Sequence, residues 1–249
     1  MRLRHALLTL AVALLASSLV PGTADHAVPH SASVAVRLDP ASSAPASGGA
    51  SRTDRRGGTQ FAWLSGASHA RWDPCAGPIT YRVNPRHLPR HGLGDIRRAF
   101  AQISAASGLR FSYVGRTSFV PHRKGQSRLV NPPGRADAHI AWTTPRVAPS
   151  LRAAAGYGGA AWGGKNSALR NGTVVLDITD YMGRTAKQRR TNRMTLLLHE
   201  FGHLVGLTHV GDRRQIMHPG TYPRRALYAA GDLRGLAAVG ASHGCVTNG

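Results

Sequence analysis

Three histidines and one glutamate fall within the stretch HEFGHLVGLTH, His199 to His209. His199 and His203 are four residues apart, so on a helix both imidazoles project from one side and can reach one zinc ion. Gly206 can adopt the positive φ that ends a helix and turns the chain, which would bring His209 back toward that ion. Three imidazoles leave the fourth position of a tetrahedral zinc open, as in a catalytic site.

Glu200 adjoins the first predicted ligand and is the only glutamate in the chain. Zinc lowers the pKa of a bound water to about 7, and a neighbouring carboxylate can take a proton from that water and return it to a leaving amine. The sequence therefore predicts metal-assisted amide hydrolysis. The alternative, that these histidines are ordinary core or surface residues of a helix, requires five fixed positions in eleven to coincide by chance.

The elements needed to position these residues have sequence signals of their own. Thr185 and Gln188 have capping-box spacing, and the apolar face of a helix follows them: Met194, Leu197, Leu198, Phe201, Leu204 and Val205. An earlier helix is predicted over residues 94–108, ending at Gly108. The predicted strands are PITYRVNP (78–85), LRFSYVG (109–115), ADAHIAWT (136–143) and GTVVLDIT (172–179). This order predicts an α/β or α+β domain with one mixed sheet.

The N-terminal region predicts export. Residues 1–24 combine a basic start, an apolar stretch shorter than the roughly 20 residues of a bilayer span, and small residues near Ala24. We expect a signal peptide cleaved there, an uncleaved membrane anchor being the alternative, and a secreted, extracellular protein. Residues 25–60 are rich in Ala, Ser, Pro and Gly and are predicted to be a disordered linker or a short propeptide. Residues 61–249 are the predicted catalytic domain.

The charge of the chain is strongly basic. There are 32 Lys and Arg residues against 11 Asp and Glu, giving a formal net charge of +21. This charge favours solubility and adhesion to polyanions, and no nucleic-acid-binding motif accompanies it. We therefore expect no specific nucleic-acid partner. No second apolar run of spanning length follows the signal, so we expect no membrane span once it is cleaved. We also expect a monomer.

The motif and its surroundings resemble a known family. HEFGHLVGLTH is similar to the HExxHxxGxxH signature of the metzincin metallopeptidases, and QIMHPGTYP places Met217 at their Met-turn. ITYRVN, DIRRAFAQISAASGLRFSYVG and AGDLRGLAAVG resemble the first strand, the first helix with the second strand, and the final helix of a matrixin catalytic domain. The resemblance covers about residues 72–241. It implies a twisted mixed sheet whose antiparallel edge strand pairs with an extended peptide substrate. AAGYGGAAWGG (154–164) stands in that strand's place, with a flexible loop as the alternative.

The resemblance also implies roles for the site residues. His199, His203 and His209 would bind one catalytic Zn²⁺, Glu200 would act as general base and then acid, and Met217 would form an apolar floor without binding metal. His218 stands where matrixins have Tyr; it could supply a fourth ligand, but we expect the turn to aim it elsewhere. No His/Asp set for a second, structural zinc is found, and Ca²⁺ remains possible without an assigned site.

Two further features bear on export and latency. Cys75 and Cys245 are the only cysteines and are predicted to form a disulfide in an exported chain. The cysteine with which matrixin propeptides often block the zinc is missing from residues 25–60. Asp232 is expected to be the N-cap of the last helix.

The predicted function is a secreted zinc endopeptidase. The alternatives are a non-enzymatic basic adhesion protein with a vestigial zinc site, or a zinc hydrolase acting on cell-wall peptides.

Overall fold

A computed structural model describes residues 60–66, 69–124, 136–162, 168–179, 185–220 and 226–246 and, as backbone, residues 30–36. The predicted signal peptide, residues 1–24, lies outside these segments, and so does most of the predicted linker. No helix within the described segments is long and apolar enough to cross a membrane.

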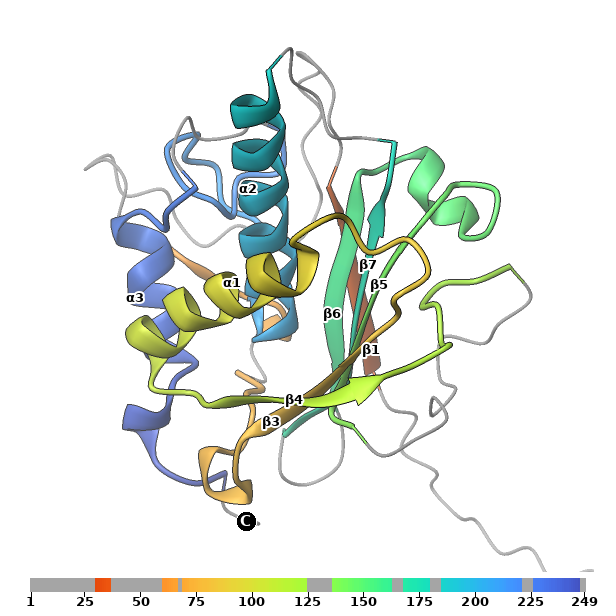
Figure 1. The fold of residues 1–249 in the computed structure, drawn as a ribbon. Coiled ribbons are helices and arrows are strands. Elements are labelled where there is room, and N and C mark those ends of the chain that lie inside the picture. Colours follow the sequence, from red (N-terminus) through yellow and green to blue (C-terminus); the bar gives the residue numbers. More distant parts are fainter. Residues whose placement is uncertain are drawn as a thin grey trace, which may run out of the picture.

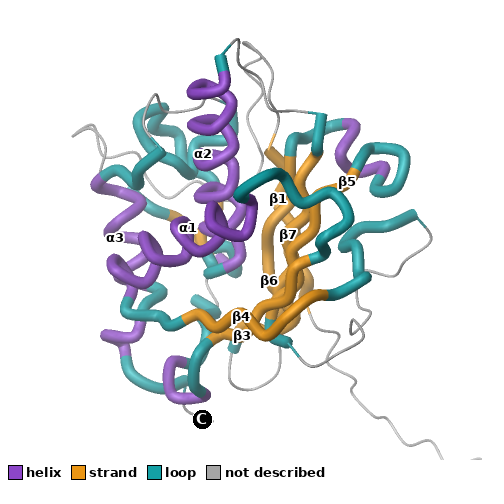
Figure 2. The backbone as a smooth tube through the Cα atoms, viewed as in Figure 1, coloured by secondary structure: helices purple, strands orange, loops and turns teal. Residues whose placement is uncertain are grey.

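The centre of the molecule is a mixed sheet of six strands in the order β1-β6-β7-β5-β3-β4 (Figures 1 and 2). Its strands are β1 (His30–Val36), β3 (Ile79–Val83), β4 (Phe111–Arg116), β5 (Ala138–Thr143), β6 (Gly156–Trp162) and β7 (Leu169–Asp177). The pairs among β4, β3, β5 and β7 are parallel, whereas β6 is antiparallel to β7 and β1 is antiparallel to β6. The predicted mixed sheet is therefore confirmed, and residues 156–162 form a strand rather than a flexible loop.

Two long helices lie beside one face of this sheet, as Figure 1 shows. α1 (Gly92–Ser107) ends where Gly108 adopts φ +71° and donates its N–H to the Ser104 carbonyl, as the sequence predicted. α2 (Ala186–Leu204) begins with a complete capping box. The Gln188 N–H donates to the Thr185 hydroxyl, and the Thr185 N–H donates to the Gln188 side-chain oxygen.

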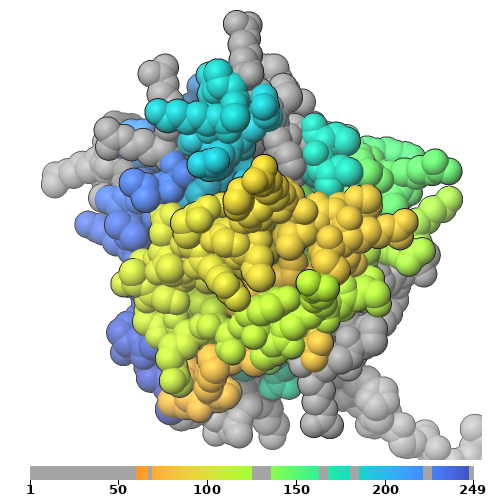
Figure 3. Space-filling view, viewed as in Figure 1, coloured from red at the N-terminus to blue at the C-terminus, as the bar shows by residue number. Residues whose placement is uncertain are grey.

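The remaining elements are short. They are β2 (Ala62–Trp63), β8 (Leu207–Thr208), α3 (Ala230–Ala238) and the 3₁₀ turns η2 (Pro74–Ala76), η3 (Pro149–Arg152) and η4 (Ala241–His243). α1 and β4 form much of the face shown in Figure 3, with the first turns of α2 rising above them.

Aromatic packing fixes α2 against α1 and the sheet. The Phe100 ring of α1 stacks on Phe201 of α2 at 4.3 Å and on Phe111 of β4 at 4.2 Å. Above this contact, the buried Asp95 carboxylate of α1 accepts a hydrogen bond of 2.8 Å from the Arg193 Nε of α2. These contacts fix the position of α2, the helix that carries His199 and His203, relative to α1 and the sheet.

The opposite face of the sheet has a smaller core. Ala148 and Leu151, in the loop that contains η3, pack on Val175 of β7, and Tyr157 of β6 lies against them. The Tyr157 hydroxyl donates to the Ser150 carbonyl at 3.0 Å. Apolar packing therefore holds this loop to the sheet within the described residues.

The two ends of the predicted catalytic domain are fastened together. Cys75 and Cys245 form the predicted disulfide, across a sequence separation of 170 residues. Beside it, the Arg71 guanidinium donates to the carbonyls of His243, Gly244 and Cys245. The C-terminal segment is thus held by both a covalent bond and hydrogen bonds.

The structure differs from the sequence expectation at the N-terminus. Residues 25–60 were expected to lack regular structure, yet His30–Val36 form β1. The reason is that this uncharged segment pairs along its whole length with β6, from His30 opposite Trp162 to Val36 opposite Gly156. A composition that cannot build its own core can still extend an existing sheet.

Candidate zinc site and active site

The predicted bend at Gly206 is present. α2 ends at Leu204, and Gly206 adopts φ +110°, which a residue with a side chain rarely does. A Cβ at this position would also lie 3.2 Å from the Ala70 carbonyl oxygen. β8 follows and pairs with β2, and this returning strand brings His209 back toward the helix.

The bend brings the three predicted ligands together. The Nε2 atoms of His199 and His203 are 3.0 Å apart, and the His209 Nε2 lies 3.2 Å from each of them. Nitrogen ligands at 2.0–2.1 Å from a tetrahedral zinc are separated by about 3.3–3.4 Å. The observed triangle is within a few tenths of an ångström of that spacing, so these residues fit a zinc ion.

Backbone carbonyls orient two of the three rings. The His199 Nδ1 lies 2.6 Å from the Ile216 carbonyl oxygen, and the His203 Nδ1 lies 2.8 Å from that of Leu207. An Nδ1–H that donates to a carbonyl leaves the lone pair on Nε2, the atom that points into the triangle. The hydrogen bonds therefore select the tautomer that a metal requires.

The surroundings keep the rings neutral. Burial lowers the pKa of His199 to about 3 and that of His209 to about 4, and it holds the pKa of His203 well below its usual value. The neighbouring imidazoles lower the pKa values of His199 and His203 further. Neutral imidazole is the form that binds metal.

Glu200 lies between α2 and β6. Its side chain is fully buried, and neither carboxylate oxygen has a hydrogen-bond partner of normal geometry within the described residues. A Cβ at Gly156 would lie 2.7 Å from the Glu200 Oε1, and one at Gly158 would lie 2.1 Å from its backbone oxygen. Burial raises the pKa of Glu200 well above its usual value, opposed in part by the Gly158 backbone N–H. Gly156 thus lets β6 pass directly against this carboxylate, and Gly158 lets it pass against the backbone of Glu200.

Met217 lies under the helix that carries the histidines. It is buried, and a Cβ at Gly202 would lie 2.3 Å from its sulfur atom. The Val210 N–H donates to the Met217 carbonyl at 3.1 Å, which closes the loop between His209 and the turn. Because Gly202 lies between the two helical histidines, Met217 packs against the turn of α2 that presents them.

The position of Asp232 corrects the sequence expectation. Ala229 is the N-cap of α3, and Asp232 is the third helical residue, whose carboxylate reaches back to the Ala229 N–H at 2.9 Å. The same carboxylate accepts the N–H groups of Ile216 at 2.8 Å and Met217 at 3.1 Å. Sequence reasoning missed this second role, because the turn and the helix meet only in the folded chain.

His218 is not part of the triangle. Its Nδ1 accepts a hydrogen bond from the Gly220 N–H at 3.1 Å. The ligand atoms of His199, His203 and His209 lie within 4.8 Å of one another, and His218 does not belong to this group. Within the described segments one other such group occurs, Asp73 with Cys75 and Cys245, and there the two sulfur atoms are joined to each other. No calcium or second zinc site is assigned among these residues.

The fold and the site together define a class. The features of a metzincin zinc peptidase are all present. They are a mixed sheet with an antiparallel strand, β6, a helix carrying HEFGH, a glycine bend that returns a third histidine, and a methionine turn beneath the histidines. The matrixin family model matches residues 71–235. The chain belongs to the matrixin family of zinc metallopeptidases.

Other comparisons are more distant. Among solved structures, archaemetzincin from Methanopyrus kandleri is similar at 17% sequence identity and a TM-score of 0.45, covering 70% of this chain and 96% of that one. Comparison with curated protein sequences gives no match.

Proposed function

We propose that this protein is a secreted zinc-dependent endopeptidase in which His199, His203 and His209 hold the metal and Glu200 is the general base. The observation that carries the proposal is the triangle of Nε2 atoms, 3.0 to 3.2 Å on a side, next to a buried carboxylate without a conventional partner. Matrixin membership supplies the reaction class, and the predicted signal peptide supports the extracellular location.

A zinc ion in this triangle would lower the pKa of a water to about 7 and polarise the carbonyl of the scissile peptide bond. Glu200 takes a proton from the attacking water and returns it to the nitrogen of the leaving amine. Hydrolysis is then balanced, because the hydroxyl of the water ends on the new carboxyl group and its remaining proton ends on the new amine. Met217 supports the ligands from below, and β6 positions an extended peptide beside Glu200.

Replacement of Glu200 tests the chemistry. Glu200→Ala removes the base while leaving all three imidazoles, so we expect the zinc content and the thermal unfolding midpoint to remain close to those of the unchanged chain. General acid–base catalysis contributes about 10²- to 10⁴-fold, and hydrolysis of an unfolded protein such as casein should fall by that factor. Glu200→Gln, which keeps the shape of the side chain, should behave in the same way.

The substrate arms separate the remaining possibilities. Unfolded protein and purified bacterial cell walls are incubated with the chain, with and without a chelator. Cleavage of the unfolded protein that stops with chelator and returns with zinc supports the endopeptidase. Release of peptide from cell walls alone would instead favour a cell-wall hydrolase. Full activity of both Glu200 variants would remove Glu200 from the mechanism.

A further inference from the structure

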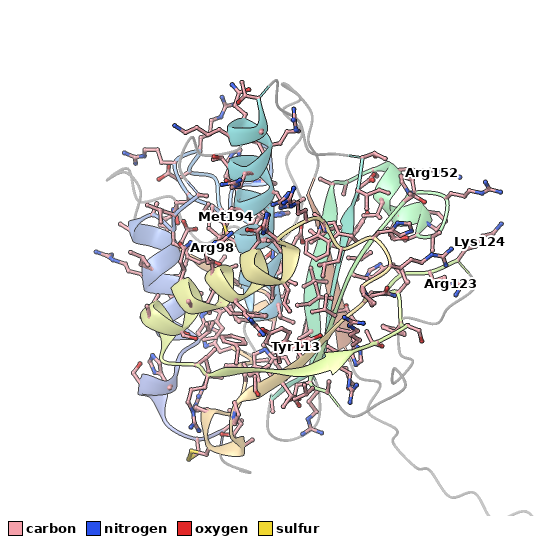
Figure 4. All side chains as sticks on the ribbon, in the orientation of Figure 1. Arg98, Tyr113, Arg123, Lys124, Arg152 and Met194 are labelled. Atoms are coloured by element: carbon pink, nitrogen blue, oxygen red, sulfur yellow. A yellow bond between two sulfur atoms is a disulfide. The ribbon has the colours of Figure 1, made fainter. Side chains whose placement is uncertain are left out.

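Four exposed cations lie on the two loops that follow β4 and β5. Residues 121–124 belong to the first loop and residues 144–153 to the second. In Figure 4, Arg123, Lys124 and Arg152 project outward, away from α2. We call the four exposed residues the cationic cluster: Arg123, Lys124, Arg146 and Arg152.

The two loops are fixed to each other and to β6. The Lys124 N–H donates to the Val147 carbonyl at 2.9 Å, which joins the loops directly. Tyr157 of β6 contacts both of them, because its ring stacks on His122 at 5.2 Å and its hydroxyl donates to the Ser150 carbonyl at 3.0 Å. The backbone that carries the cationic cluster is therefore already ordered, and a partner need not order it on binding.

Acidic residues do little to neutralise the cluster. Asp137 is the only acidic residue between Asp95 and Asp177. It precedes the six residues of β5, so roughly 20 Å of strand separates it from the loop that follows β5. Charges are screened over about 8 Å at physiological ionic strength. Asp177 ends β7 but is buried, and its carboxylate accepts hydrogen bonds from Thr179. Within the described residues, no acid forms an ion pair with the cluster.

The types of residue in the cluster favour phosphate groups on a polymer. Three of the four are arginines, and a planar guanidinium group can bind two phosphate oxygens at once. A small anion would meet these exposed side chains one at a time, and a single exposed ion pair contributes little to binding. A linear polymer brings many phosphates to the surface together, and each contact releases counterions.

We propose that the cationic cluster is a docking surface for a linear phosphate-bearing polymer outside the cell. The extracellular setting is that of the proposed function, but the binding itself requires neither zinc nor catalysis. Because the cluster projects away from α2, a polymer docked there leaves the helix that carries His199 and Glu200 uncovered. The enzyme would thus be held on an anionic surface with its hydrolytic site still open to substrate.

Replacement of the cluster by glutamines tests the docking surface. The variant carries Arg123→Gln, Lys124→Gln, Arg146→Gln and Arg152→Gln, and the probe is fluorescently labelled long-chain inorganic polyphosphate. Four phosphate contacts add about 3 to the slope of log K against log salt. Between 50 and 200 mM salt, binding to the unchanged chain should therefore weaken about 50-fold more than binding to the variant. Fluorescence anisotropy titrations at several salt concentrations measure the slope.

The matched control removes the same charge elsewhere on the surface. Its four glutamines replace exposed residues that also comprise three arginines and one lysine, on or beside other elements: Arg110, Lys187, Arg190 and Arg234. The control should keep the slope of the unchanged chain to within about 1. Equal loss of slope in both variants would show that the net charge of the whole chain binds the polymer, and would overturn the proposal.

A charge-preserving variant separates binding from folding. Arg123→Lys, Arg146→Lys and Arg152→Lys together keep the positive charge and should keep the slope to within about 1. Loss of the slope in this variant, with an unchanged thermal unfolding midpoint, would contradict a surface that binds through its charge.

Competing polymers test the chemistry of the partner. Unlabelled polyphosphate should displace the probe at a lower concentration of charge than polyglutamate or duplex DNA does. Stronger displacement by polyglutamate would overturn the choice of phosphate, and stronger displacement by DNA would indicate a nucleic-acid surface instead. Hydrolysis of a short uncharged peptide should be equal in all variants. If no variant hydrolyses it, the proposed function fails, while the salt slopes still decide whether the cluster binds the polymer.

Discussion

At the scale of single residues, hydrogen bonds connect the Asp232 carboxylate to the His199 ring through the backbone of Ile216. Asp232 accepts the N–H of Ile216, and the carbonyl of the same Ile216 lies 2.6 Å from the His199 Nδ1. It also accepts the N–H of Met217, which packs against Gly202 between the two helical ligands. A side chain outside the histidine triangle thus orients His199, a predicted metal ligand, and holds the methionine beneath it.

Asp232→Asn should weaken zinc binding. Two N–H groups donate to one carboxylate oxygen of Asp232 and a third donates to the other. An amide keeps one acceptor oxygen and replaces the other with an N–H₂ group, so one or two of the three donors lose their acceptor. Outer-shell changes of this kind typically cost about 10- to 100-fold in metal affinity, and an unsatisfied buried group costs about 1–3 kcal/mol of stability. Competition with a zinc chelator and urea unfolding measure the two effects. Asp212→Asn, which alters a surface pair with Arg214, is the control and should change neither quantity appreciably.

His139 predicts a pH dependence of stability. Its ring is 1% exposed, and neither nitrogen has a hydrogen-bond partner within the described residues. Burial, and secondarily the charge of Arg82, lowers its pKa to about 4. Below the unfolded value of about 6.5 the unfolded chain therefore binds a proton that the folded chain refuses. Stability is lost as the pH falls from about 6.5 to about 4, and it changes no further below that.

The His139 contribution is isolated by difference, because the predicted zinc ligands would also lose metal in acid. His139→Gln cannot take up a proton, so the fall in unfolding free energy between pH 6.5 and pH 4 should be about 2 kcal/mol smaller than in the unchanged chain. Chemical denaturation of both proteins at several pH values gives this difference. Parallel curves would show that His139 takes up its proton in the folded state as readily as in the unfolded one.

At the scale of elements, features set by neighbours in the sequence could be predicted, whereas features set by long-range contacts could not. The start of α2 and the bend at Gly206 follow from neighbours in sequence, a capping box and a glycine, and both are present in the structure. β1 could not be predicted, because its pairing with β6 joins residues more than a hundred positions apart. The contacts of Asp232 with Ile216 and Met217 were missed for the same reason, since these two partners lie outside α3.

The approach of α2 to β6 depends on Gly158. A Cβ there would lie 2.1 Å from the Glu200 backbone oxygen, which cannot rotate away as a side chain could. Gly158→Ala should therefore push the two elements apart, costing about 1–3 kcal/mol of stability. Displacement of Glu200 by even part of an ångström should lower kcat, by up to about 10²-fold.

Gly211→Ala is the matched control for this substitution. No atom lies within 4 Å of a Cβ built at Gly211, and its φ is not in the left-handed region. The control should keep full kcat and the same unfolding free energy to within about 1 kcal/mol. If Gly158→Ala matched the control in both measurements, the close contact between α2 and β6 would not be needed for catalysis.

At the scale of the whole molecule, the surface charge is spread widely while the site itself is shielded from it. Figure 4 shows Arg123, Lys124 and Arg152 projecting outward at one end of the sheet, away from α2. Of the predicted site residues, His199, His203 and Glu200 are instead buried, and His209 is half-buried. The excess of +21 therefore bears on solubility and on adhesion to anionic surfaces rather than on the hydrolytic step.

The disulfide is the longest-range covalent constraint on this fold. It closes a loop spanning 170 residues, and a loop of this length is expected to contribute up to about 5 kcal/mol by restricting the unfolded chain. Cys75→Ser with Cys245→Ser should lower the unfolding free energy by about 2–5 kcal/mol. Because Arg71 still holds the carbonyls of His243 and Gly244, zinc affinity and kcat at 25 °C should change little. Urea unfolding with and without reductant measures the effect, and the double-serine variant serves as the control that reductant cannot destabilise further. A reductant-insensitive unchanged chain would contradict the assignment of this bond as a stabilising constraint.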